Sequence, residues 1–111
     1  MPVYDIRQLK KELVTPQHSS AFGSLITGER IELGVLRYKA GEGAKEHAHP
    51  QEQILLLLKG RARLTLGAEV FDLGPGQAAH IPPHLPHSLS VLEDAEVVSV
   101  KSIVGGAGHR I

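Results

Sequence analysis

Seven histidines stand in a chain of 111 residues that contains no cysteine. Without thiols the chain cannot form disulfides, zinc sites with thiolate ligands, iron–sulfur clusters or cysteine nucleophiles. Imidazole is therefore the only strong ligand for a transition metal that the chain offers. Five of the histidines lie in one stretch of the sequence: His47, His49, His80, His84 and His87. Metal coordination is the chemistry that this grouping indicates.

His47 and His49 are separated by a single residue. In an extended strand, residues i and i+2 point to the same face, about 6–7 Å apart along the strand. Two imidazoles at that separation can converge on one ion. A lone histidine pair is often only a surface feature, but this pair lies between Gly41 and Gly60, and His87 follows in a second, proline-rich histidine group. The spacing therefore favours a metal site built from more than one segment.

The elements that must position these side chains have the pattern of short β-strands. After Pro16, glycines and prolines recur at short intervals, with runs rich in Val, Ile and Leu between them. This punctuation predicts an all-β sandwich or barrel. The run from 54 to 58 is apolar throughout, which predicts a central strand covered on both faces. The expected strands are 20–26, 30–38, 45–48, 53–59, 61–66, 69–73, 78–81, 87–92 and 96–104, with tight turns at Gly28-Glu29, Gly60, Gly67-Ala68 and Glu93-Asp94.

The two ends of the chain differ from this strand pattern. Asp5 and Gln8 stand at capping-box spacing, and apolar residues follow at helical spacing up to Leu13, which predicts a short helix that ends before Pro16. The glycine-rich tail, residues 105–111, is expected to be mobile.

The charges of the chain are balanced, with 12 Lys and Arg against 12 Asp and Glu. That balance provides no electrostatic case for binding nucleic acid or an anionic membrane. The longest apolar run is too short to cross a membrane, and the N-terminal segment lacks the apolar core of a signal peptide. We therefore expect a cytoplasmic protein, folded as a single domain over residues 1–111, that binds neither nucleic acid nor membranes.

Two segments resemble the sequence motifs of the cupins. The stretch GEGAKEHAHPQEQILLLLKG, residues 41–60, resembles the first motif, in which Gly, His-x-His, Glu or Gln, and Gly keep a fixed register. The segment LGPGQAAHIPPHLPHSL, residues 73–89, is similar to the second motif, which ends in a Pro-x-x-x-x-His ligand. The resemblance implies a double-stranded β-helix, or jelly-roll, barrel with one divalent metal (Zn, Ni, Fe, Co or Mn) in its mouth. Carried over position by position, it implies the ligands His47, His49, Gln53 and His87.

The second motif and the fourth ligand position depart from the family pattern. Gln53 stands where the family usually has Glu, and the neighbouring Glu52 faces the opposite way by strand parity. His84 lies three residues before His87, so it could replace that ligand or line the pocket. His80 is the other extra histidine of this motif.

The implied ligand set is uncharged. Three His and one Gln leave the +2 charge of the ion uncompensated, which strengthens the Lewis acid and favours a small anionic ligand. The His-Pro-x-Glu-Gln form, residues 49–53, resembles single-domain cupins that ketonise unsaturated uronates, and related polyketide cyclases. We expect an enzyme that isomerises, ketonises or cyclises a small oxygen-rich anion. Two alternatives stay open: a three-His Fe or Ni dioxygenase, and a non-catalytic ligand-binding cupin.

Other charged residues are candidates for the pocket. In the uronate-ketonising cupins the last strand carries an Asp that points into the pocket, but here the sequence at that place is Ser99-Val100-Lys101, so this proton-handling Asp is missing. Lys101 could instead bind a carboxylate. Arg37 shares an apolar face of its strand and would then stand at the pocket rim, unless it extends into solvent. We also expect a homodimer, because so short a sandwich leaves sheet edges to cover.

Overall fold

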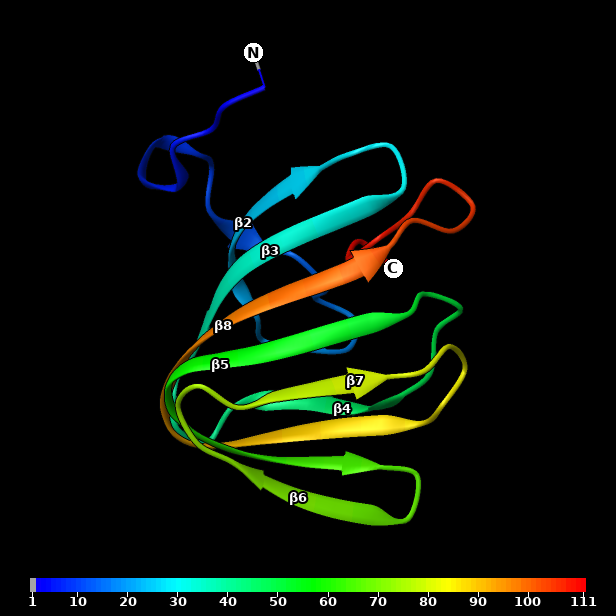
Figure 1. Ribbon diagram of the computed structural model, residues 1–111. Helices are drawn as coiled ribbons and strands as arrows, with labels where there is room; N and C mark the ends of the chain where they lie inside the picture. Colours follow the sequence, from blue (N-terminus) through cyan, green and yellow to red (C-terminus); the bar gives the residue numbers. More distant parts are fainter. Residues whose placement is uncertain (1) are drawn as a thin grey trace.

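The computed structural model describes residues 2–111, and nearly all of its regular structure is β-strand (Figure 1). The prediction of an all-β jelly-roll fold is confirmed. The elements in chain order are the 3₁₀ helix η1 (Ile6–Gln8) and the strands β1 (Glu12–Leu13), β2 (Phe22–Thr27), β3 (Ile31–Tyr38), β4 (Gly43–His47), β5 (Gln53–Leu66), β6 (Glu69–Leu73), β7 (Ala78–Ile81) and β8 (His87–Ser102).

Two long strands, β5 and β8, join the two layers of the molecule. They pair antiparallel along their lengths, with shifts of register between Leu57 and Ala62 where both strands bend. The first half of β5 and the second half of β8 lie in one layer, in the order β1-β2-β3-β8-β5-β7. Their other halves form the second layer with β4 and β6. Figure 1 shows the sheet folding over on itself at these bends, on its left side.

The bends replace two of the expected turns. Gly60 and Glu93-Asp94 do not end strands but lie inside β5 and β8. Gly60 has φ +90°, and a Cβ there would lie only 2.3 Å from the carbonyl oxygen of Asp94, so glycine is required for the two bent strands to approach each other. A glycine between two apolar runs fits a hairpin turn and a bend in one strand equally well, and only the long-range pairing distinguishes them. The turn at Gly67-Ala68, by contrast, does connect β5 to β6.

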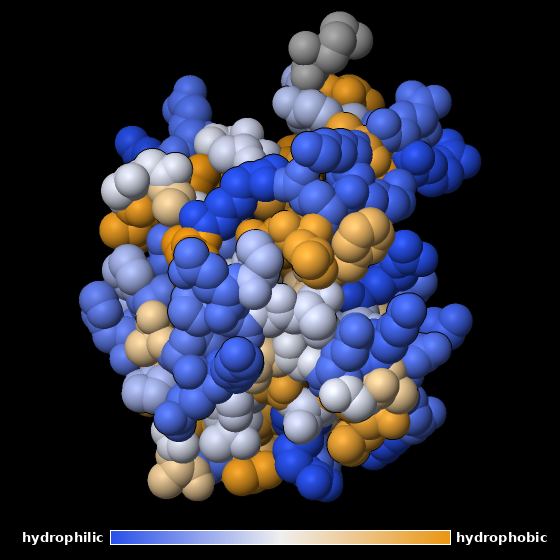
Figure 2. All heavy atoms as spheres, turned by 180° about the vertical axis from the view of Figure 1, so that it is seen from behind, coloured by the Kyte–Doolittle hydropathy of each residue, from blue (hydrophilic) through white to orange (hydrophobic). Residues whose placement is uncertain are grey.

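Burial along β5 alternates, as in a strand with one face on the core. Leu55 and Leu57 are buried in the apolar core, whereas Ile54 is 50% exposed and Leu58 is 48% exposed. The prediction that both faces of this run are covered is therefore wrong, because an apolar run fits a strand with one exposed apolar face equally well. Figure 2 shows that apolar side chains also reach the surface, between charged ones, on the face behind that of Figure 1.

The exposed positions of β5 belong to a larger apolar area on the outside of the first layer, which we name the outer apolar patch. Cross-strand pairing aligns Leu33 with Val100 and Ile54 in one row. It aligns Val35 with Val98 and Leu56 in the next row. All of its residues are exposed or only partly buried. The patch consists of Ile31, Leu33, Val35, Ile54, Leu56, Leu58, Val98 and Val100.

The N-terminal segment makes only one helical turn. Asp5 caps η1, accepting a hydrogen bond from the backbone nitrogen of Arg7 at 3.0 Å, but Leu9 is already extended and Glu12–Leu13 pairs with β2. The predicted helix beyond Gln8 is wrong, since pairing with β2 satisfies the backbone groups that a helix would have used. No helix in residues 2–111 is long and apolar enough to cross a membrane.

The C-terminal tail is ordered against the barrel. Val104 and Ala107 form a β-bridge, and the Gln51 side chain donates to the Ala107 carbonyl at 2.8 Å. His109 is only 2% exposed. The prediction of a mobile tail is therefore wrong: side chains far away in the sequence bind its backbone, which glycine content alone does not indicate.

Candidate metal centre

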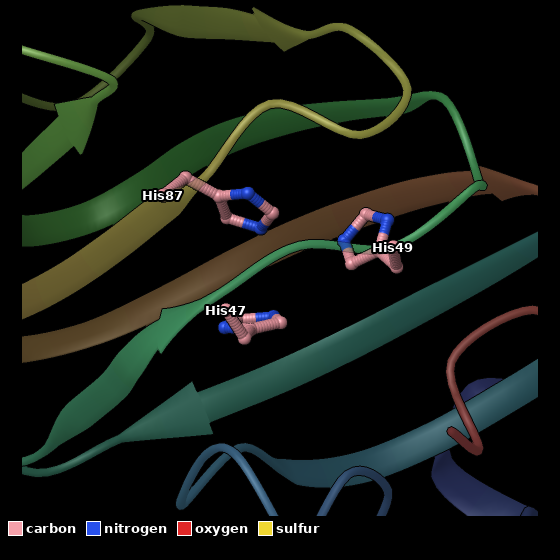
Figure 3. Close-up of side chains that lie close together, drawn as sticks. All are labelled: His47, His49 and His87. Atoms are coloured by element: carbon pink, nitrogen blue, oxygen red, sulfur yellow. The ribbon is translucent and has the colours of Figure 1, made fainter.

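Three histidines meet at the mouth of the barrel (Figure 3). His47 ends β4, His49 follows in the next loop, and His87 begins β8. Antiparallel pairing of β4 with β8 sets His47 opposite His87. One ring nitrogen of each histidine lies within 4.8 Å of the other two. This separation suits three nitrogens that bind a single ion.

Hydrogen bonds fix the tautomer of all three rings. Each ring contacts, through Nδ1, a backbone carbonyl oxygen two residues away, at 2.6 Å for His47, 2.9 Å for His49 and 2.8 Å for His87. Because a carbonyl oxygen only accepts, Nδ1 carries the proton and Nε2 keeps its lone pair. A backbone partner on the far nitrogen is the arrangement typical of metal-ligating histidines.

The three rings are also neutral. Burial lowers the pKa of His47, His49 and His87, and it lowers that of His49 to about 4, with the positive charge of Lys101 as the next cause. The Nε2 atom of His49 is buried and has no hydrogen-bond partner among residues 2–111. A buried nitrogen without a partner is costly unless something binds it. The group therefore fits a divalent metal ion.

Gln53 lines the same cavity as His47 and His87. It begins β5 and is 9% exposed. Its Nε2 donates to the hydroxyl of Ser99 at 2.9 Å. The other end of the amide is a carbonyl oxygen, an atom that divalent metals accept as a ligand.

The cavity is small, with a volume of about 40 Å³. Lys101 lines it and is only 4% exposed, since inward-facing positions of β8 alternate with the outer apolar patch. Burial lowers the pKa of Lys101 to about 8, against the opposing effect of Glu32. The polar residues that line the cavity include His47, Gln53, His87, Ser99, Lys101 and His109.

Arg37 lies away from this cavity. Residues on β3 alternate so that Leu36 and Tyr38 point into the core, and Arg37 is exposed on the outside, with its guanidinium carbon 5.8 Å from the centre of the Phe22 ring. Of the two positions that the sequence leaves open for Arg37, the structure has the one in which the side chain extends into solvent. The apolar residues that share its face form part of the outer apolar patch, which the sequence pattern does not distinguish from a core face.

The two extra histidines of the second motif do not join the three-histidine group. His84 is exposed, and its backbone nitrogen donates to the His49 carbonyl at 2.8 Å, so its backbone links the two loops. His84 also has φ +66°, a left-handed conformation that is uncommon for residues other than glycine. His80 pairs with Glu52 at 2.6 Å on the outer surface.

Two further histidines lie next to the three-histidine group or in the wall of its cavity, although no motif includes them. The ring of His18 stacks on that of His47, with centroids 4.8 Å apart and planes at 10°. His109 lies in the cavity wall between Glu32 and Ser99. No local sequence signal identifies either residue, because both reach the centre only through the tertiary fold.

Comparisons with known proteins agree with this geometry. The family model described as "Cupin domain" matches residues 34–101, more than half of the chain. An RmlC-like cupin from Shewanella frigidimarina superposes with a TM-score of 0.83 at 14% identity, covering 95% of this chain and 93% of that one. The polyketide cyclase RemF from Streptomyces resistomycificus superposes with a TM-score of 0.81 at 21% identity, covering 100% and 85%.

One characterised relative is an enzyme of greater length. The acireductone dioxygenase of Bacillus pumilus is 30% identical over 69 residues, which cover 58% of this chain and 39% of the enzyme. The chain thus corresponds to less than half of that relative. With the family model, the jelly-roll architecture and the three-histidine group in agreement, the chain belongs to the cupin family.

Proposed function

We propose that this cupin binds one divalent transition metal through His47, His49, His87 and Gln53, and that the metal acts as a Lewis acid on a small anionic molecule. The observation that carries the proposal is the convergence of three neutral imidazoles whose Nε2 lone pairs are left free. Three imidazoles and an amide oxygen suit Zn, Ni, Fe, Co or Mn. When bound, such an ion polarises a carbonyl, enol or carboxylate oxygen.

The charge in the cavity supports an anionic ligand. All four proposed metal ligands are neutral, so none reduces the charge of the ion. Lys101 adds a second positive group on the cavity wall. The nearby carboxylate of Glu32 is already occupied by hydrogen bonds from Thr27 and His109. A carboxylate or enolate would therefore find two cations and no competing free anion.

Lys101 is also the residue suited to moving a proton. Lys101 lines the cavity, and its pKa of about 8 lies close to neutral pH, where an acid–base group works best. Isomerisation, ketonisation and cyclisation each need a proton to be moved next to a polarised oxygen. In this proposal the ligands hold the metal, and Lys101 binds the anion and exchanges its proton.

A second candidate is oxygen chemistry at a three-histidine iron or nickel centre. The 30% identity to an acireductone dioxygenase favours it, although that match covers only 58% of this chain. Both candidates use the same metal ligands and differ in whether dioxygen is consumed.

The test begins with metal analysis of protein purified without a histidine tag. We expect about one equivalent of bound or titratable metal in the wild type and none in His47→Ala. The metal-loaded protein is then incubated with small oxo-, hydroxy- and unsaturated carboxylates, aerobically and anaerobically. Turnover without oxygen uptake supports the Lewis-acid enzyme, and turnover with oxygen uptake supports the dioxygenase. Saturable binding without turnover would identify a ligand-binding cupin, and absence of metal uptake would refute the proposal.

A further inference from the structure

The tail after β8 folds back on the barrel (Figure 1, red), and His109 lines the same cavity as His47, Gln53 and His87. Four hydrogen bonds to residues outside the tail hold His109. Its backbone nitrogen and its Nδ1 contact Glu32 Oε1 at 2.6 and 2.7 Å. Its carbonyl accepts from the Thr15 hydroxyl at 2.8 Å, and its Nε2 lies 2.8 Å from Ser99 Oγ. Ser99 in turn accepts from Gln53, so one continuous chain of hydrogen bonds runs from Glu32 to the fourth proposed ligand.

The direction of each hydrogen bond follows from the Glu32 end. Burial raises the pKa of Glu32, but hydrogen bonds from Thr27 and His109 outweigh it and leave that pKa below its usual value, so the carboxylate is ionised and only accepts. His109 Nδ1 must therefore carry its proton. Burial lowers the pKa of His109 to about 4, so the ring is neutral and Nε2 is a lone pair. The Ser99 hydroxyl, 2.8 Å from that lone pair, donates to it.

This order decides which way the Gln53 amide faces. With its proton committed to His109, Ser99 Oγ can only accept from Gln53. If the amide were flipped, two acceptor oxygens would face each other at about the same 2.9 Å separation. The NH₂ end is thus held on Ser99, and the carbonyl oxygen is the end left for the cavity. An NH₂ group has no lone pair to offer a metal, so the orientation determines whether Gln53 can be a ligand.

We propose that His109 and Glu32 are positioning residues of the metal centre, which act through Ser99 to hold the carbonyl oxygen of Gln53 toward the ion. The proposal rests on the metal-binding function proposed above. Glu32 and His109 both lie outside residues 34–101, the part of the chain that the cupin model matches. We call the hydrogen-bonded chain from Glu32 through His109 and Ser99 the relay. Its two outer residues come from segments that flank the matched part of this chain.

The tail is built for close approach to Glu32. A Cβ at position 108 would lie 2.6 Å from Glu32 Oε1, so Gly108 is needed for the backbone to reach the carboxylate. On either side, Gln51 binds the Ala107 carbonyl, and Arg110 forms an ion pair with Glu12 on the outer surface. These contacts fix the tail without touching the cavity.

The test is a double-mutant cycle read by cobalt binding. Co²⁺ alone is titrated into the wild type, Ser99→Ala and His109→Ala, each with Gln53 or with Gln53→Glu. A carboxylate has two equivalent oxygens, so it needs no relay to present one. With Gln53 we expect roughly 10–100-fold weaker Co²⁺ binding in either relay variant, the usual effect of losing a partner that orients a ligand. With Gln53→Glu we expect no further loss.

The visible spectrum of bound Co²⁺ provides a second readout. We expect Ser99→Ala, which leaves the tail sequence intact, to give the spectrum of Gln53→Ala, because both lose the amide oxygen. Arg110→Ala is the matched tail control and should bind Co²⁺ like the wild type. Equal losses in the Gln53 and Gln53→Glu proteins would mean a purely structural role and overturn the proposal, as would relay variants that bind like the wild type. A wild type that binds no Co²⁺ would overturn the metal-binding function and this inference with it.

Discussion

His47 and His87 occupy directly opposed positions on the antiparallel strands β4 and β8, and their ring centroids lie 4.5 Å apart. Because the side chains of opposed residues point to the same face, the pairing brings these two rings together, and a shift of register between Ala44 and His47 sets His47 opposite His87. A slip of one residue would send His47 to the other side of the sheet. The pairing of the two motifs is thus part of the proposed metal centre.

Removal of one imidazole should abolish tight metal binding. For His87→Ala we expect the affinity for Ni²⁺ or Zn²⁺ to fall by more than the roughly 10–100-fold that follows loss of a ligand's hydrogen-bond partner. Calorimetric titration measures the change. His80→Ala, which removes an exposed histidine paired with Glu52, is the control and should bind like the wild type. Equal affinities for His87→Ala and His80→Ala would contradict the proposed ligand set.

Lys101→Met should separate anion binding from metal binding. Loss of a charged hydrogen-bond donor typically costs about 1.5–3 kcal/mol, so we expect roughly 10–100-fold weaker binding of small carboxylates such as malonate to the Co²⁺ protein. Metal affinity should not fall, since the lysine repels the ion. Spectral titration follows both events. Lys59→Met removes an exposed lysine and serves as the control; a parallel loss there would show that only overall charge matters.

Stability should depend on pH through His109. Its pKa is about 4 in the folded state, below the ordinary value of 6.5, so the unfolded chain takes up this proton first as the pH falls. The folded state is therefore favoured fully above about pH 6.5 and loses up to about 1.4 kcal/mol per pH unit from this residue as the pH falls toward 4. Urea denaturation between pH 7.5 and 4.5 measures the slope. His109→Gln should show a shallower slope, and an unchanged slope would exclude this histidine as its source.

The outer apolar patch supports the proposed homodimer. Ile54 lies in a row of apolar side chains that the rest of the described chain leaves partly open, and a second copy of the same sheet face would cover it. We expect the wild type to sediment as a dimer and Ile54→Glu as a monomer. Val70→Glu places the same charge on β6, outside the patch, and should stay dimeric. A monomeric wild type would refute this prediction.

Much of the fold was predictable because strand signals are local. Alternation and turn residues mark where strands form, and the nine expected strands correspond to seven of the observed ones, four of them merging in pairs. The merging at Gly60 and at Glu93-Asp94 was not predictable, because it depends on the pairing of β5 with β8. The same holds for β1, whose two residues, Glu12–Leu13, are a strand only because β2 lies beside them.

The residues of the candidate site likewise fall into those with a local sequence signal and those that only the tertiary fold brings together. His47 and His49 stand at a spacing that already indicates convergence, and the motif register singles out Gln53 and His87. Glu32 and His109, by contrast, are separated by 77 residues, so only the tertiary fold brings them together. The position of Arg37 stayed open for a related reason, since an apolar outer face and a core face share one sequence pattern.

Strand β8 carries His87 at its start and Lys101 near its end, and it pairs with β5 in both layers. The two layers therefore cannot separate as two rigid halves, because separation would break the hydrogen bonds between β5 and β8 that run through both layers. A ligand of the proposed metal centre would enter through the barrel mouth, where His18 stacks on His47 and the loop that carries His84 binds the His49 carbonyl. Amide hydrogen exchange in β5 and β8 should accordingly be slow and uniform along both strands, while the mouth loops exchange fast and set the rate of ligand entry.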